Sequence, residues 1–491
     1  MRPATWIIVL ALAAIVAACA PAPLATLPAA SATLASDASG PTPLPVRTPH
    51  PPGEIFIYAA QQGDTLPAVA AHFHTAEREV LAANPDLPTG ITTLPPGYPL
   101  RVPAYYLPLT GSPLHMLPDS EVVNGPGSVG FDTQTEITAR AGFLAGMTDY
   151  ANSRERPAWE IVDIVAIEYS IHPRLLLTLL EAGTAALTRP TASGDDLTYP
   201  LGFRSDRYRG LYRQLLWAAE SLNRGYYGWR TGTLTELELS DGRLVRPDPW
   251  LNAGTAALHV LLAARFGQAD FDLQTGPDGF QHTYRQLWGD PFAGQVDFIP
   301  GNLQQAELGL PFLPDRVWDF TGGPHDTWGT TLPMGALDFA PPAMEGGCAL
   351  SGEWIAAPAA GIVTRSEKAV VILDLGDDGD ERTGWALLFF HVGTDGRVAA
   401  GTALEQGGQI GHPSCEGGRS TGTHFHIARK YNGEWIPAYG PLPFILDGWV
   451  AAYGGRPYEG TLTKGSKIVS ASTASTAANR ILYTLPGVEA P

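Results

Sequence analysis

The spacing of apolar positions changes several times along the chain, and each change predicts a different kind of segment. An unbroken apolar run covers residues 6–18, and residues 20–53 show no periodicity. Residues 54–104 alternate like a strand, then repeat with helical spacing, then alternate again. Helical spacing dominates from 106 to 310, and short alternating runs follow from 311 onward. The pattern predicts a multidomain chain with a small βααβ module, a mainly α-helical middle domain and an antiparallel β domain.

The N-terminal segment 1–19 has the features of an export signal. Arg2 precedes the apolar run, which is shorter than the roughly 20 residues needed to span a bilayer. The run ends in Val16-Ala17-Ala18-Cys19, which resembles a lipobox and implies that Cys19 is lipidated and becomes the first residue of the mature chain. The alternative is ordinary secretion with cleavage after Ala18. We expect an exported lipoprotein that is anchored to the membrane and faces the cell wall.

Residues 20–53 are rich in Pro, Ala, Ser and Thr and contain almost no charge or aromatic side chain, so they cannot form a core. We interpret them as a tether that, in polyproline-like conformation, reaches on the order of 100 Å. The chain has three cysteines. With Cys19 taken by lipid, Cys348 and Cys415 remain as an even pair in a compartment that permits disulfides, so we predict that they are bonded to each other.

The βααβ module, residues 54–104, carries four short motifs in order: QGDTL at 62–66, NP at 84–85, LPPG at 94–97 and LRVP at 100–103. Asp64 or Thr65 is placed to cap a helix that has proline in its first turn. Together these motifs resemble a LysM module.

The resemblance implies that the module binds peptidoglycan, through N-acetylglucosamine chains held between its first turn and the loop before its last strand. By this resemblance Gly63, Asp64, Thr65 and Asn84 lie near the glycan. The alternative for each of these residues is a role in the turn alone.

The middle domain, residues 106–310, contains the run IHPRLLLTLLEAG, which faintly resembles the opening of a lysozyme-like transglycosylase domain. Glu181 occupies the place of the catalytic acid in that family. Ala182 stands where a serine usually follows, and no later Gly-Leu-Met-Gln motif is found. We therefore predict a structural helical domain of unknown role rather than a second active site.

The C-terminal β domain is expected over residues 311–455, followed by an extension at 456–491. Its acidic segment GDDGDERT misses the spacing of an EF-hand calcium loop and is interpreted as a hairpin turn. The motifs DFAP, FFHVG and GTHFHIAR follow one another in this domain. His424 and His426 are two residues apart on an expected strand, so both imidazoles project from one face while Phe425 packs on the other.

In this order the motifs resemble the LytM or lysostaphin-type zinc metallopeptidases, family M23. The resemblance implies one zinc ion, bound by Asp338 and His426, with an open position for substrate. It assigns His391 and His424 to assisting the attacking water and the tetrahedral transition state. His412 matches no ligand position, and we interpret it as structural.

One position departs from this family. Its first zinc ligand is the histidine of His-x-x-x-Asp, and the residue four before Asp338 is Met334. A thioether is a weak ligand for zinc beside imidazole and carboxylate. Either another side chain completes the site or the domain does not cut. We predict that His325, reaching back from a flexible glycine-rich loop, is the third ligand; the alternative is that His325 caps a turn and the site is inactive.

The sequence therefore predicts a zinc endopeptidase that acts on the peptide cross-links of peptidoglycan. A second hypothesis is a degenerate domain that binds wall peptides or regulates another wall hydrolase, and a third is a glycan-cleaving enzyme that uses Glu181. The net charge of −18 argues against a nucleic-acid partner, because it repels a phosphate backbone.

Overall fold

A computed structural model of the chain describes residues 42, 44–45, 47, 50–105, 111–342, 346–376 and 378–483. The chain divides into two units, residues 1–41 and 42–491. The expected signal peptide, Cys19 and most of the tether lie outside the described residues. Within the part that is described, no helix is both long and apolar enough to cross a bilayer.

The βααβ arrangement expected for residues 54–104 is present. Its elements are β1 (Glu54–Ala59), α1 (Leu66–His72), α2 (Glu77–Ala83) and β2 (Pro99–Ala104), and β1 pairs antiparallel with β2. Helix α1 begins where the Thr65 side chain accepts a hydrogen bond from the amide of Ala68, with Pro67 in the first turn. The helix-spaced Val69, Phe73 and Val80 are fully buried in the core between the helices and the strands.

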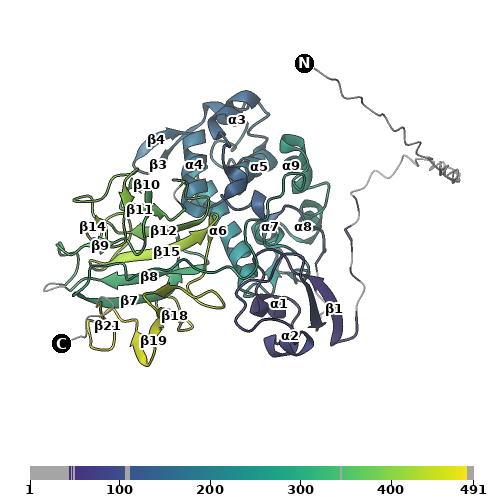
Figure 1. Cartoon of the computed structure of the whole chain (residues 1–491). Helices are drawn as coiled ribbons and strands as arrows, with labels where there is room; N and C mark the ends of the chain where they lie inside the picture. Colours follow the sequence, from purple (N-terminus) through teal and green to yellow (C-terminus); the bar gives the residue numbers. More distant parts are fainter. Residues whose placement is uncertain are drawn as a thin grey trace, which may run out of the picture. The chain divides into compact units, whose positions relative to one another are not determined.

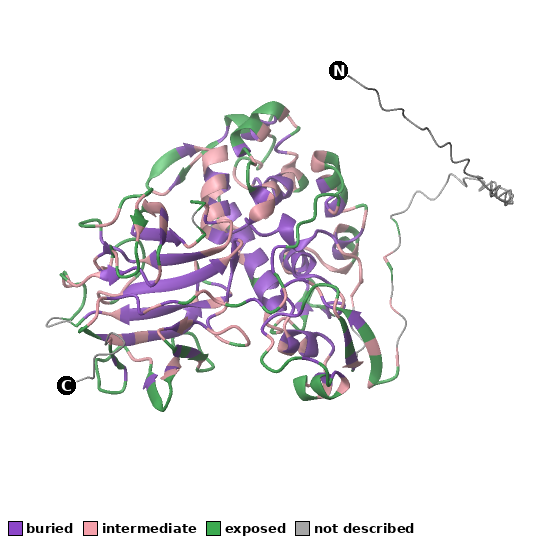
Figure 2. Cartoon of the chain, in the orientation of Figure 1, coloured by how far each residue is buried: buried purple, intermediate pink, exposed green. Residues whose placement is uncertain are grey.

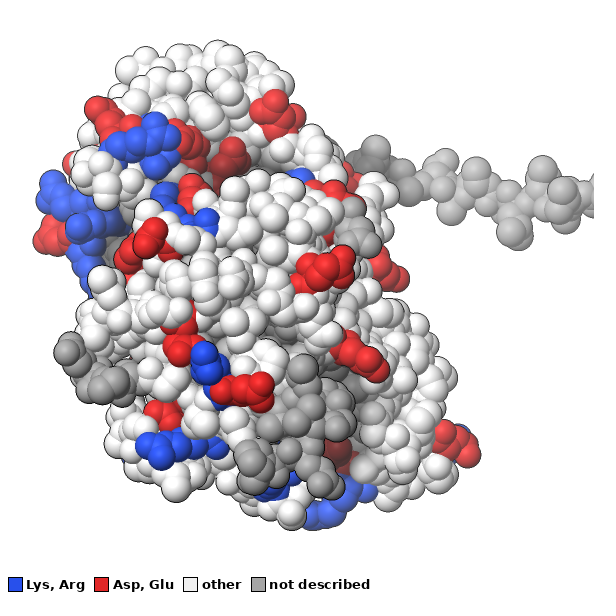
Figure 3. Space-filling view, turned by 60° about the vertical axis from the view of Figure 1, so that its left-hand side comes forward, with Lys and Arg blue, Asp and Glu red and all other residues white. Residues whose placement is uncertain are grey.

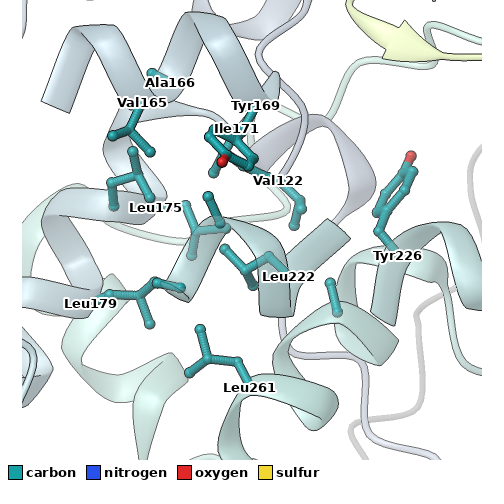
Figure 4. Close-up of a cluster of buried hydrophobic side chains, with 14 of the residues drawn as sticks. Val122, Val165, Ala166, Tyr169, Ile171, Leu175, Leu179, Leu222, Tyr226 and Leu261 are labelled. Carbon is teal, nitrogen blue, oxygen red and sulfur yellow. The ribbon is translucent and has the colours of Figure 1, made fainter. Parts of the chain in front are cut away.

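The middle of the chain is mainly helical, as expected. Its helices are α3 (Thr133–Arg140), α4 (Ala158–Tyr169), α5 (Pro173–Thr184), α6 (Leu211–Arg230), α7 (Ala253–Ala263), α8 (Gln268–Thr275) and α9 (Phe280–Trp288). Two hairpins, β3 (Thr148–Ala151) with β4 (Arg154–Pro157) and β5 (Leu237–Glu238) with β6 (Leu244–Val245), join them. Figure 4 shows how Val165, Leu175, Leu222 and Leu261 from four of these helices meet in one core.

The C-terminal region is antiparallel β structure, and its strands line up on the side of the cartoon opposite the helices (Figure 1). The large sheet runs in the order β13-β10-β11-β12-β15-β8-β7-β21, with β16 paired to β15. Its strands are β7 (Val317–Asp326), β8 (Met334–Ala340), β10 (Gly361–Glu367), β11 (Val370–Asp374), β12 (Trp385–Phe390), β13 (Ala403–Leu404), β15 (Phe425–Tyr431), β16 (Glu434–Trp435) and β21 (Arg480–Leu482). Smaller sheets join β9 (Ile355–Ala356) to β14 (Gln409–Gly411), and β17 (Ile445–Leu446), β18 (Trp449–Tyr453), β19 (Gly460–Lys464) and β20 (Lys467–Ser470).

The large sheet is buried on both faces, which Figure 2 shows as a run of buried strands. Successive side chains of a strand point to opposite faces. Ile372, Leu388 and Ala428 accordingly pack into the core of the helical domain, whereas Leu373 and Phe389 pack into the core of the β domain. The helical domain therefore covers one part of one sheet face and leaves the other part of that face uncovered by helices.

The segment expected as a C-terminal extension is built into the β domain. Strand β19 pairs with β18, and β21 pairs with β7 at the edge of the large sheet. The segment GDDGDERT joins β11 to β12 as the expected hairpin connection. On the face drawn in Figure 3, acidic and basic side chains are interspersed between broad areas that carry neither charge.

Candidate metal centre

Three neighbouring strands bring His325, Asp338 and His426 together. His426 on β15 pairs directly with Asp338 on β8, and His325 on β7 pairs with Ala336, two residues before Asp338. Strand β7 is bulged at Phe320, Gly322 and His325, which turns the His325 side chain toward Asp338. Gly322 permits this packing, because a Cβ atom there would lie 2.6 Å from Asp338 Oδ2. His325 thus reaches the cluster from a strand, where the sequence suggested a flexible loop.

The candidate ligand atoms of these residues converge. His325 Nε2 lies 3.2 Å from Asp338 Oδ1 and 3.0 Å from His426 Nδ1, and His426 Nδ1 lies 3.5 Å from Asp338 Oδ1. All three ligand atoms lie within 4.8 Å of one another, and all three side chains are buried. Two imidazoles and one carboxylate are ligand types that suit zinc.

Backbone carbonyls fix which ring nitrogen of each histidine carries the hydrogen. His325 Nδ1 lies 2.8 Å from the carbonyl of Gly323, and His426 Nε2 lies 3.1 Å from that of Thr327. A carbonyl only accepts, so these nitrogens donate and the opposite nitrogens, His325 Nε2 and His426 Nδ1, keep their lone pairs. When both rings are neutral, three electron pairs therefore face one another, and Asp338 Oδ1 is buried without a hydrogen-bond partner among the described residues. Such a set fits a cation and matches the carbonyl-oriented histidines of zinc sites.

Electrostatics keep the carboxyl group in the form that binds metal. Burial alone would raise the pKa of Asp338, but the imidazoles of His325, His426 and His424 hold it well below its usual value. Burial lowers the pKa of His426, whereas at His325 the effect of burial is outweighed by Asp338, which raises the pKa of that imidazole. An ionised carboxylate and a neutral imidazole are the protonation states that metal binding requires.

A second pair of histidines lies beside the cluster. The rings of His391 and His424 are 4.6 Å apart, and His424 Nε2 lies 3.9 Å from Asp338 Oδ2. His391 Nδ1 donates to the carbonyl of Glu416 at 2.7 Å, and His424 Nδ1 donates to that of Gly422 at 2.8 Å. Burial lowers the pKa of His391 to about 4. His391 is therefore neutral at pH 7, with an unprotonated Nε2.

The cluster opens into a cleft of about 1670 Å³. His325, Asp338, His391, His424 and His426 all line it, together with the loops 346–353 and 419–424. A disulfide bond joins Cys348 to Cys415, which is the pairing expected from the sequence. It links the first loop to the chain segment that precedes the second loop. Every residue that lines the cleft lies between 317 and 480, so the walls come from the β domain itself.

Two other residues singled out by the sequence lie outside this arrangement, and one contact was not anticipated. Met334 pairs with Asp326 at the start of β8 and does not line the cleft within the described residues. His412 packs against Trp354 with its ring tilted by 41° and bonds to the carbonyl of Glu353. Tyr458, in the expected extension, stacks on the His325 ring at 4.2 Å and lines the cleft. Only the aromatic residue in the turn GGRPYEG could have signalled that contact.

The residues expected near a glycan are mostly engaged in the chain's own contacts. Asp64 accepts hydrogen bonds from the Tyr58 hydroxyl and the Gln61 amide, and burial raises its pKa to about 6. Asn84 bonds to backbone groups of Val80 and Arg101, Thr65 caps α1, and the guanidinium of Arg230 packs on Gly63.

Glu181 has a local role as well. Its carboxylate accepts hydrogen bonds from the amides of Leu187 and Thr188 and from the Thr188 hydroxyl. These contacts hold the loop that follows α5.

An antiparallel β domain with a cleft over a His/Asp/His cluster provides the site that a metallopeptidase requires. Comparison with known proteins points in the same direction. The family described as "LasA, N-terminal domain" matches residues 115–300. The chain is 28% identical to Protease LasA of Pseudomonas aeruginosa over 364 residues, which cover 70% of this chain and 78% of that protein.

A second relative matches a shorter stretch of the chain. Over 160 residues the chain is 28% identical to the beta-lytic metalloendopeptidase of Lysobacter enzymogenes, covering 31% of this chain and 83% of that enzyme. A solved structure described as "A Novel M23 Metalloprotease Pseudoalterin from Deep-sea" aligns with 34% of this chain and 96% of that one, at 21% identity and a TM-score of 0.29. The homology to a protease and a metalloendopeptidase supports the enzyme class expected from the sequence.

Proposed function

We propose that this protein is a zinc metalloendopeptidase that cleaves the peptide cross-links of peptidoglycan. The observation that carries the proposal is the convergence of three candidate ligand atoms, from His325, Asp338 and His426, in the lining of an open cleft. His325 is the third ligand in this proposal, so Met334 leaves no vacancy. Three protein ligands are the usual set of a catalytic zinc site.

When bound, zinc supplies Lewis-acid activation of the scissile carbonyl and of water. The remaining work is done by the chain. His391 and His424 lie beside the cluster, where one ring accepts a proton from the attacking water and returns it to the leaving amine. The other donates a hydrogen bond to the developing oxyanion once it is protonated. These side chains line an open cleft of about 1670 Å³.

Localisation is part of the same proposal. Export and a lipid anchor at Cys19 hold the enzyme at the membrane, and the tether extends it toward the wall. The module at residues 54–104 binds wall glycan and keeps the cleft near the cross-links. The order of motifs in the sequence and the βααβ fold support this arrangement.

The test compares the whole chain with two variants, His325→Ala and Met334→His, for zinc stoichiometry and for hydrolysis of purified cell walls. The wild type is expected to bind one zinc ion and to release new peptide termini, because its donor set is complete. His325→Ala should lose both properties, and Met334→His should change neither.

The alternatives give other results. A wild type without zinc that gains both binding and cleavage on Met334→His would mean that the first ligand is missing and that the domain is regulatory. Anhydro-sugar ends in the digest, in place of peptide termini, would point to Glu181.

A further inference from the structure

The face of the βααβ module where glycan is expected is covered by another segment of the same chain. This face, which we call the glycan face, consists of the first turn, residues 61–65, and the loop 91–95 that precedes β2. The two parts are held together because the amide of Leu94 donates to the carbonyl of Asp64 at 2.7 Å. Residues 298–303, which follow α9 and precede β7, lie across both parts.

Hydrogen bonds join the covering segment to the glycan face along its length. The amide of Phe298 donates to Gln62 Oε1 at 2.8 Å, and the amide of Asn302 donates to the carbonyl of Thr93 at 2.7 Å. In the opposite direction, the Thr93 hydroxyl donates to the carbonyl of Pro300 at 2.8 Å, and the Thr92 hydroxyl donates to that of Leu303 at 2.6 Å. The segment therefore uses the hydroxyl and amide groups of the face, which are the groups a sugar needs.

The contact is also tightly packed. Gln62, Thr92 and Thr93 are each no more than 7% exposed. Gly301 lies so close to Pro95 that a Cβ atom on it would be 2.6 Å from the Pro95 Cα. No sugar fits between the segment and the face, so glycan and segment exclude each other.

We propose that residues 298–303 compete in cis with N-acetylglucosamine chains for the glycan face, so that wall glycan binds only when this segment leaves. The inference rests on the proposed glycan-binding role of the module. In this proposal, glycan binding is coupled to the linker between the helical and β domains. The carbonyl of Phe298, in the same segment, also accepts a hydrogen bond from Asn432. Asn432 belongs to the turn between β15, which carries His426, and β16.

A matched pair of glycine variants tests this competition. Gly301→Leu places a side chain against Pro95 and should displace the segment. Gly294→Leu is the control, because Gly294 lies six residues after the end of α9 at Trp288 and nothing is within 4 Å of the added Cβ. Binding of tetra-N-acetylchitotetraose to the whole chain is measured by calorimetry. Gly301→Leu should bind at least about tenfold more tightly than the wild type and Gly294→Leu, a ratio equivalent to about 1.4 kcal/mol.

A second measurement does not depend on the variants. Saturating tetrasaccharide should speed hydrogen exchange at the amides of Phe298 and Asn302 in the wild type, because their acceptors on the glycan face are lost. Equal affinities of wild type and Gly301→Leu, binding without faster exchange in 298–303, or no binding by any of the three chains would each overturn the proposal. Cleavage of a soluble wall peptide by the same chains tests the peptidase separately, because Gly301 does not line the cleft.

Discussion

At the scale of single residues, the division of labour among the histidines follows from what each ring nitrogen faces. His325 and His426 each turn one ring nitrogen toward Asp338, whereas His391 donates from Nδ1 to the carbonyl of Glu416 and lies beside the cluster. A backbone carbonyl orients each of these rings, so the carbonyls alone do not separate the proposed ligands from the proposed base. The separation comes from position, because the ligand atoms of His325, Asp338 and His426 converge and His391 lies outside that group.

This division predicts separable effects of two histidine variants. His391→Ala should retain one zinc ion per chain but lower kcat by about 10²- to 10⁴-fold, because a positioned base is lost and no ligand is removed. His412→Ala should leave both properties near those of the wild type, since His412 packs against Trp354 and bonds to the backbone carbonyl of Glu353, away from the cluster. Zinc content and steady-state hydrolysis of wall peptide are the measurements. Loss of zinc from His391→Ala would show that His391 is a ligand.

The sequence indicated which residues form the candidate site, but it did not indicate which strands and turns bring all of them together. Asp338, His424 and His426 could be assigned from their motifs, and His325 from its ligand chemistry alone. The path of His325 was not predictable, because VWDFTGGPHD does not alternate and its bulges depend on pairing with β8. Tyr458 was missed for a similar reason, because it stacks on His325, which lies 133 residues earlier in the sequence.

At the scale of the elements, buried charges fix how the strands of the large sheet pack. Glu381, in the connection between β11 and β12, accepts a hydrogen bond from Arg365 on β10 and pairs with Lys430 on β15. Burial alone would raise the pKa of Glu381, but Lys430 and Arg365 lower it to about 2. The hairpin connection predicted from GDDGDERT therefore also holds three strands together, which the sequence pattern did not indicate.

Glu381→Gln should lower the free energy of unfolding by about 3–5 kcal/mol at pH 7, because two buried cations lose their partner. The folded-state pKa of about 2 lies below the ordinary value of 4.5, so the stabilisation is complete above pH 4.5 and is lost as the pH falls toward 2. The difference between variant and wild type should shrink across that window in urea titrations. Glu367→Gln, at an exposed position of β10, is the control. A difference that stays constant from pH 7 to pH 3 would contradict this account.

At the scale of the whole described chain, one arginine joins three regions. Arg230, at the end of α6, donates to Glu434 on β16 and to Asp119 before α3, both at 3.0 Å, and to the carbonyl of Gln62 in the βααβ module. All of these side chains are buried. The order of the regions was predictable from hydrophobic periodicity, but their mutual packing was not, because it depends on contacts between positions hundreds of residues apart.

Arg230→Met should lower the free energy of unfolding by about 3–5 kcal/mol, since Glu434 and Asp119 would remain buried without their cation. Unfolding should also lose cooperativity, because the regions no longer share this contact. Urea denaturation followed by circular dichroism and tryptophan fluorescence measures both effects. Arg213→Met, at an exposed position of the same helix, should change stability by less than about 0.5 kcal/mol. A variant Arg230→Met as stable as Arg213→Met would rule out this role.

The large sheet has one face divided between two uses. Ala336 and Ala428 pack into the helical core, while Asp338 and His426, two residues further along the same face of the same strands, hold the candidate metal centre. A β domain cut free of residues 111–310 would present Ile372, Leu388 and Trp435 to water as a contiguous apolar surface. The isolated fragment would consequently be prone to self-association. In the whole chain the helical domain buries this apolar surface and so keeps it from water.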